Sequence, residues 1–159
     1  MGIAGLEKAE KRPESVLVLV YTRSGEVLMM ERVQPRGFWQ SVTGSLRWGE
    51  SAPAAAVREL AEETGLQAGH RLLDLRAGAR FPIVPPWRAR YAPEVHVNRE
   101  HWFALELPAR RTIRLNRKEH RQYRWMSAGL AARRATSWTN RKLIRQWMSR
   151  CRMTPSGLG

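Results

Sequence analysis

Three glutamates crowd into one short stretch of the chain, at positions 59, 62 and 63, directly after Arg58. On an α-helix, Glu59 and Glu63 share one face, and Glu62 lies three residues from Glu59. Like charges at these spacings repel by roughly 0.2–0.5 kcal/mol per pair, which a solvated helix end tolerates and which Arg58 can partly relieve. A convergent set of carboxylate oxygens is also what a hydrated Mg²⁺ ion requires. The spacing is therefore compatible with a solvated acidic helix end, but we favour a divalent-metal site.

The residues around the glutamates predict a loop, a helix and a second loop. Ser51 and Pro53 are typical of a helix start, and Gly65 is typical of a helix stop. The helix is therefore expected from about Ala52 to Thr64. The glycine at position 44 precedes it and would let the backbone approach a ligand closely.

Alternating and apolar runs elsewhere predict an α/β protein with several strands. A proline-broken stretch at 81–86 is expected as a loop. Tryptophans such as Trp138, taken singly, are expected to pack in the core. Strands are expected at 15–21, 27–30, 39–43, 72–75, 94–107 and 123–126, and further helices at 127–134 and 139–152.

Length and composition predict a single soluble domain. The 159 residues are 43% hydrophobic and 26% charged, and no apolar run approaches the ~20 residues that a membrane-spanning helix needs. We expect a flexible arm at 1–14, one domain at 15–152 and a disordered tail at 153–159. The single cysteine, Cys151, excludes an internal disulfide and favours a reducing cytoplasm.

The formal net charge of +14 predicts an anionic partner, which could be nucleic acid, membrane phosphates or a phosphorylated small molecule. Half of the 28 lysines and arginines follow Glu106, where the only acid is Glu119. A solvated basic surface is favoured over direct contact with a polyanion. Nucleic acid stays possible but is not favoured, because no RNA-binding motif is recognised.

Residues 44–66 resemble the Nudix box, G-x5-E-x7-R-E-U-x-E-E-x-G-U, with U a bulky aliphatic residue. The resemblance implies an α/β/α sandwich with a mixed β-sheet and a loop–helix–loop catalytic motif. It also implies Mg²⁺-dependent hydrolysis of a diphosphate bond, with Mn²⁺ able to substitute. All specified positions are filled at the correct spacing, by Gly44, Glu50, Arg58, Glu59, Leu60, Glu62, Glu63, Gly65 and Leu66.

The resemblance also implies roles for the charged residues of the box. Glu59 and Glu63 become metal ligands, and Glu62 a further ligand or the general base. Arg58 orients the carboxylates without touching the substrate. Glu50 holds the loop or binds a further metal. The identity of the general base stays open, because it varies within the family.

Segments outside the box resemble the bacterial dihydroneopterin triphosphate diphosphatases, which release pyrophosphate and leave the monophosphate, an early step towards folate. The resemblance implies that Glu119 is a further metal ligand reaching in from a loop. The implied substrate contacts are Lys11, Arg32, Thr43 and Ser137, with Phe81, Pro82, Ile83 and Val84 lining the pocket. The matching segments are 11–13, 38–45, 90–93, 102–103, 119–120 and 137–141.

Three functions remain open from the sequence. The first is the pterin triphosphate diphosphatase, acting on a small-molecule triphosphate as a monomer or small homo-oligomer, with no membrane partner. The second is a dATP-like nucleoside triphosphate pyrophosphatase or an RNA 5′-pyrophosphohydrolase. The third is a non-catalytic nucleic-acid-binding module, which the complete acidic cluster disfavours because carboxylates repel phosphate unless a metal intervenes.

Overall fold

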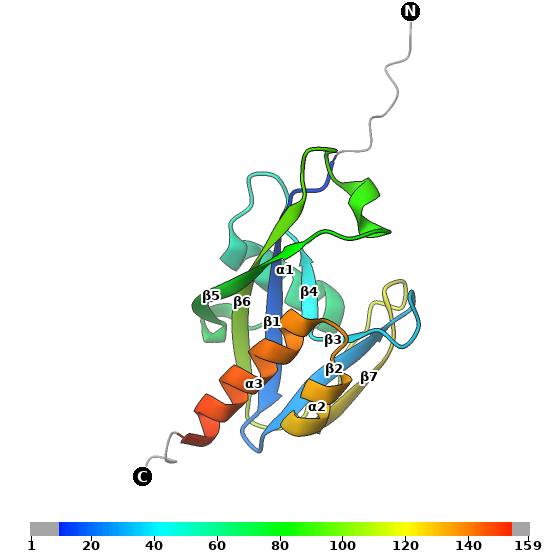
Figure 1. Cartoon of the computed structure of the whole chain (residues 1–159). Coiled ribbons are helices and arrows are strands. Elements are labelled where there is room, and N and C mark those ends of the chain that lie inside the picture. The colour runs from blue at the N-terminus through cyan, green and yellow to red at the C-terminus, as the bar shows by residue number, and fades with distance from the viewer. Residues whose placement is uncertain (1–9, 154–159) are drawn as a thin grey trace, which may run out of the picture.

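A mixed β-sheet with helices on both faces forms the protein (Figure 1). The structure, a computed structural model, describes residues 10–153. Its strands are β1 (Glu14–Thr22), β2 (Glu26–Arg32), β3 (Trp39–Gln40), β4 (Val42–Ser45), β5 (Leu73–Pro82), β6 (Val97–Leu107) and β7 (His120–Ser127). Its helices are α1 (Ala52–Thr64), α2 (Ala128–Arg134) and α3 (Trp138–Met153), with short 3-10 turns η1 (Gly69–Arg71) and η2 (Trp87–Arg90).

Strand β1 shows why the sequence makes three layers. Its side chains alternate between the two faces of the sheet, as in any β-strand. Val16 and Val18 pack in one core with Leu60 of α1, whereas Leu17 and Leu19 pack in a second core with α2 and α3. A strand buried on both faces is apolar at nearly every position, which explains the unbroken run in β1. The predicted α/β/α sandwich with a mixed sheet is confirmed.

The topology of the sheet makes room for a site at one end of β1. The strand order is β3-β2-β1-β6-β5, and β1 pairs parallel with β6. β2 meets β1 near Tyr21 and Val27, and it pairs along its length with β7. The first half of β1 pairs instead with β4, the strand that enters the loop before α1. The second half of α1 and the start of β7 flank the same part of the sheet.

The predicted helix is confirmed at residues 52–64, with the expected ends. The side chain of Ser51 accepts a hydrogen bond from the backbone N–H of Ala54. Gly65 ends the helix in the left-handed conformation, with φ of 76°, which glycine adopts without strain. The two later helices also form, within a residue or two of their predicted bounds.

Two predicted strands differ most from the structure, while those expected at 94–107 and 123–126 form with starts at Val97 and His120. The expected strand at 39–43 is two short strands, because the chain passes from pairing with β2 to pairing with β1. β5 is longer than expected and includes Phe81 and Pro82, so the predicted 81–86 loop is wrong at its start. A break in register between Asp74 and Gly78 interrupts the alternation of β5, which hid the strand from the sequence pattern.

The domain boundaries at 14/15 and 152/153 stay a prediction, and the structure describes residues on both sides of each. Residues 1–9 and 154–159 lie outside the described residues. Within the predicted arm, the backbone N–H of Lys11 donates to Arg90, the Arg12 side chain is hydrogen-bonded, and Glu14 begins β1. At the other end, α3 continues to residue 153.

Among the described helices, none is long and apolar enough to cross a membrane.

Candidate active site

A cavity of about 730 Å³ opens where α1, β4, the end of β2 and the start of β7 meet. Its lining combines acidic and basic side chains with backbone of the loop before α1. The acidic residues are Glu10, Glu59, Glu63 and Glu119, and the basic ones are Lys11, Arg12, Arg32, Arg47, Arg58, Arg90 and Lys118. Such a mixture can hold a cation and a polyanion side by side.

Three carboxylates come together in this cavity, those of Glu59 and Glu63 on α1 and that of Glu119 directly before β7. Glu63 is 1% exposed, and one of its oxygens accepts the backbone N–H of Thr43 at 3.1 Å. Burial, followed by repulsion from Glu59 and Glu119, raises the pKa of Glu63 well above its usual range. Burial also raises the pKa of Glu59, which the Glu62 and Glu119 charges raise further. These pKa shifts mean that the protein alone leaves the negative charge undercompensated.

His120 lies in the same cluster and was not assigned a role from the sequence. Ligand atoms of Glu63, Glu119 and His120 lie within 4.8 Å of one another. His120 Nε2 is 3.8 Å from a Glu63 oxygen and 2.9 Å from Nε2 of Gln40, while its buried Nδ1 has no hydrogen-bond partner among the described residues. Burial, and then Arg32, lowers the pKa of His120 to about 4. The ring is therefore neutral at neutral pH, with Nε2 accepting a hydrogen bond from the Gln40 amide and the ring proton on Nδ1.

Arg58 holds the carboxylates of the motif in place. Its guanidinium donates two hydrogen bonds of 2.8 Å to Glu50 and one of 2.7 Å to Glu59. It also donates to the backbone carbonyl of Ser45, which ties α1 to the end of β4. Glu50 in turn accepts the backbone N–H of Arg47. Of the two roles left open for Glu50, this geometry supports holding the loop, since its oxygens are engaged by protein donors.

Gly44 allows the close approach of Glu59 to strand β4. A Cβ atom at position 44 would overlap the Glu59 carboxylate. In contrast to the predicted approach of a ligand, the group that approaches Gly44 is a carboxylate of the protein itself. Any side chain at 44 would push Glu59 out of its position beside Arg58.

Glu62 lies apart from the other box carboxylates. Its side chain is 48% exposed, and it forms ion pairs with Arg47 at 3.6 Å and Arg58 at 3.4 Å. Among the described residues, Glu62 does not line the cavity. The structure therefore does not bring Glu62 to the cluster, in contrast to the predicted role as a ligand or base.

Two of the predicted substrate contacts supply cations to the cavity. Lys11 lies 5.7 Å from the Tyr91 ring centroid, and Arg32 lies 5.8 Å from that of Phe38. Burial lowers the pKa of Lys11, and the neighbouring Arg90 and Arg32 charges lower it further. This crowding of cations, like that of the carboxylates, favours a ligand of opposite charge. Thr43 also lines the cavity, but its hydroxyl donates to a backbone carbonyl of β1.

The remaining predicted substrate contacts lie elsewhere. Ser137 accepts the backbone N–H of Asn140 and so caps the start of α3. Phe81 and Pro82 pair with β6, Ile83 is buried, and Val84 is half exposed. Within the described chain, none of these residues lines the catalytic cavity. The geometry thus does not support the predicted pocket wall at 81–84 or the contact at 137.

Comparison with known proteins agrees with the architecture of the site. Residues 11–147 match the model of the NUDIX domain. Dihydroneopterin triphosphate diphosphatase of Escherichia coli (strain K12) is 42% identical over 146 residues, covering 89% of this chain and 96% of the relative. An RNA pyrophosphohydrolase of Sphingopyxis alaskensis is 31% identical over 125 residues, covering 70% of this chain and 75% of the relative.

A solved structure matches the fold over most of the chain. The structure of the E. coli dihydroneopterin triphosphate pyrophosphohydrolase superposes with a TM-score of 0.82, covering 89% of this chain and 98% of that one at 42% identity. The NUDIX match over residues 11–147 includes the box, α1 and the strands that flank the cavity. The chain belongs to the Nudix family.

Proposed function

We propose that the protein hydrolyses dihydroneopterin triphosphate to dihydroneopterin monophosphate and pyrophosphate. The observation that carries this proposal is the 42% identity, over nearly the whole of both chains, to a protein of that activity. The cavity supports it independently, because buried carboxylates line it together with a set of lysines and arginines. A triphosphate carries enough charge to engage both groups at once when a divalent cation accompanies it.

The cluster of Glu63, Glu119 and His120, with Glu59 beside it, would hold the divalent cation, and Mg²⁺ is the ion we propose. Carboxylates whose pKa values are raised by burial and mutual repulsion gain most from a nearby cation. When bound, such an ion polarises phosphate oxygens and stabilises the charge on departing pyrophosphate. The fit rests on the donor set, since the carboxylates of Glu59, Glu63 and Glu119 suit Mg²⁺ or Mn²⁺.

The side chains of the cavity would bind and orient the substrate and accept the proton of the attacking water. Lys11, Arg32, Arg90 and Lys118 line the cavity, where they would neutralise and orient the triphosphate. Arg58 would hold Glu59 towards the reacting phosphate through their 2.7 Å hydrogen bond. In the reaction a water oxygen forms a bond to the α-phosphorus while the bond to pyrophosphate breaks, and a carboxylate of the cavity takes the water proton.

A second candidate is hydrolysis of a nucleoside triphosphate such as dATP or of the 5′ end of RNA. The 31% identity to an RNA pyrophosphohydrolase and the net charge of +14 favour it. Lower identity and shorter coverage make it the weaker candidate. We further propose a cytoplasmic location, as expected from the single cysteine, and a monomer or small homo-oligomer.

The test compares kcat/KM for dihydroneopterin triphosphate, dATP and 5′-triphosphorylated RNA in Mg²⁺, with identification of the released group. We expect the pterin to be preferred and pyrophosphate to be released. Preference for RNA or dATP would refute the pterin assignment and leave the reaction class intact. Release of orthophosphate from every substrate would refute the assigned bond.

A further inference from the structure

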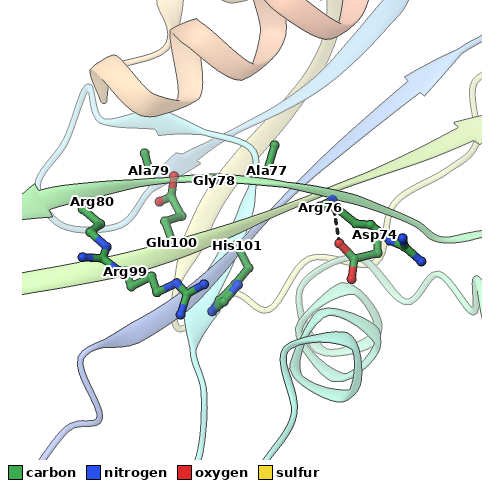
Figure 2. Close-up of a pocket in the computed structure, with 9 residues that line it drawn as sticks. All are labelled: Asp74, Arg76, Ala77, Gly78, Ala79, Arg80, Arg99, Glu100 and His101. Carbon is green, nitrogen blue, oxygen red and sulfur yellow. Dashed lines mark hydrogen bonds between the residues drawn. The ribbon is translucent and has the colours of Figure 1, made fainter.

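A second cavity, of about 450 Å³, lies on the β5–β6 hairpin (Figure 2). It forms at the break in register, where residues between Asp74 and Gly78 leave the ladder of β6. Gly78 permits the close contact that closes the break, because a Cβ there would overlap the backbone oxygen of Glu100. Its volume falls in the range of small-molecule sites, roughly 300–1,000 Å³. Apart from Gly78 and two alanines, every residue of its lining is titratable.

Arginines crowd one side of this cavity. Arg80 on β5 and Arg99 on β6 lie directly opposite each other in the antiparallel ladder. Figure 2 shows that their side chains and that of His101 project to the same side of the two strands. Like charges at directly opposed positions destabilise a strand pair. The protein therefore retains an unfavourable pair where a neutral residue would serve the sheet better.

The acidic residues of the lining do not compensate these two arginines. Among the described residues, neither Arg80 nor Arg99 forms an ion pair with a carboxylate. Glu100 projects to the opposite side of the strands and accepts the indole N–H of Trp102. Asp74 lies beside Arg76 and accepts its backbone N–H. The excess positive charge on the Arg80 side is thus left for an external anion.

His101 marks the boundary between this cavity and the catalytic one. Its Nε2 lies 2.9 Å from Glu14, whose other oxygen accepts a hydrogen bond from Arg12. Arg12 lines the catalytic cavity, whereas Arg80 and Arg99 do not. The two arginines can therefore be changed without touching the catalytic lining, and His101 is best left unchanged in a test.

We propose that Arg80 and Arg99 form a separate anion site, which binds the phosphate groups of a small phosphorylated molecule. Two guanidinium groups side by side match the several oxygens of a phosphate, with which arginine forms paired hydrogen bonds. A multiply charged anion would also remove the repulsion between the arginines, and a single carboxylate would do so only in part. The site does not depend on the reaction proposed for the catalytic cavity.

The test is a titration of the whole chain with inorganic pyrophosphate in EDTA, followed by backbone amide NMR. We expect saturable shifts at Gly78, Ala79 and Arg99, separate from any shifts at Gly44 in the catalytic cavity. Arg99→Gln and Arg80→Gln should each weaken binding at the hairpin about tenfold, because each removes hydrogen bonds to a charged group. The matched control, Arg133→Gln, removes one exposed charge on α2 and should change the affinity less than about twofold.

Several outcomes would overturn the proposal. Absence of saturable shifts at the hairpin, or equal weakening by Arg133→Gln, would mean that only general charge attraction operates. Equal binding of citrate would exclude a phosphate-specific site. Tighter binding of a single-stranded oligonucleotide, with shifts extending beyond the cavity, would identify a nucleic-acid surface instead. Two controls show that weaker pyrophosphate binding is not caused by loss of the fold. The thermal midpoint of Arg80→Gln and of Arg99→Gln should be unchanged or higher, because each removes one member of a like-charged pair. The kcat/KM of both variants should equal that of wild type.

Discussion

The same catalytic motif contains two glutamates, Glu50 and Glu63, whose pKa values are shifted in opposite directions. At the loop end, Arg58 donates two hydrogen bonds to Glu50 and lowers the pKa of that carboxyl to about 2. At the cavity end, burial and neighbouring carboxylates raise the pKa of Glu63 well above its usual range. Each of these glutamates lies in a region with little solvent. The difference therefore lies both in burial, which is complete at Glu63 and partial at Glu50, and in the charged partners.

This contrast assigns Glu50 a structural role and Glu63 a role in the proposed metal site. A carboxylate whose charge is balanced within the protein stabilises the fold and has no further need of a ligand. A carboxylate that is buried and repelled by its neighbours is held in place by the rest of the structure and gains when a cation arrives. The sequence motif contains both kinds, so membership of the motif alone does not tell which glutamate does chemistry.

The largest expected effect comes from removing the charge at the cavity end. Glu63→Gln keeps the shape and the acceptor for Thr43 but removes a carboxylate of the proposed metal site. We expect kcat in Mg²⁺ to fall about 10³-fold, equivalent to about 4 kcal/mol of lost transition-state stabilisation. Steady-state kinetics at saturating Mg²⁺ measure it. Activity within about tenfold of wild type would exclude Glu63 from the metal site.

The same variant should be more stable than wild type without metal. Because the pKa of Glu63 is raised on folding, its favourable contribution is present below the ordinary value of 4.5 and is lost as the pH rises through the folded value. In EDTA, the thermal midpoint of Glu63→Gln should therefore exceed that of wild type at pH 8, and the gap should shrink towards pH 5. A gap that widens on acidification would contradict the assigned direction.

Removing the ion pair between Arg58 and Glu50 should lower the stability of the fold. Arg58→Gln leaves Glu50 and Glu59 without their shared cation, and both partners in the Glu50 pair are less than 20% exposed. We expect a loss of about 3 kcal/mol, which lowers the thermal midpoint by roughly 6–12 °C in a domain of this size. Scanning calorimetry at pH 7 measures it. The matched control is Arg47→Gln, whose ion pair with Glu62 is largely exposed and should change stability by less than about 1 kcal/mol.

The acid dependence sharpens the same comparison. The pKa of Glu50 is lowered on folding to about 2, so its contribution is present above the ordinary value of 4.5 and is lost as the pH falls towards 2. The stability difference between wild type and Arg58→Gln should therefore narrow below pH 4. A constant difference down to pH 2 would mean that Arg58 acts through packing alone.

Local signals made one part of this site predictable from sequence. The helix bounds follow from Ser51 and Gly65, and the spacing of Glu59 and Glu63 follows from helix geometry, so no tertiary information was needed. Glu62 shows the limit of such reasoning. It shares the helix, but which side of the helix faces the sheet decides that Glu63 is buried and Glu62 is not.

Tertiary placement decided what the sequence could not. His120 enters the site because β7 pairs with the end of β2, which places residue 120 opposite Arg32 and beside α1. Residues 81–84, predicted as a pocket wall, lie outside the lining of the described cavity, and Phe81 and Pro82 pair with β6. Trp138, expected in the core, is 50% exposed, since the first turn of α3 leaves it on the outer side. Periodicity contains no information about such long-range register.

The smallest expected effect tests whether His120 belongs with the unbalanced glutamates. Mg²⁺ prefers oxygen ligands, whereas an imidazole adds more affinity for Co²⁺. His120→Gln keeps a partner for Gln40 and should weaken Co²⁺ binding about tenfold, with a smaller loss for Mg²⁺. Calorimetric titration of both ions gives the ratio of affinities, which a general loss of structure would leave unchanged. If the affinities for Co²⁺ and Mg²⁺ fall by the same factor, His120 is not a ligand and only supports the site. The proposed cation is then held by carboxylates alone.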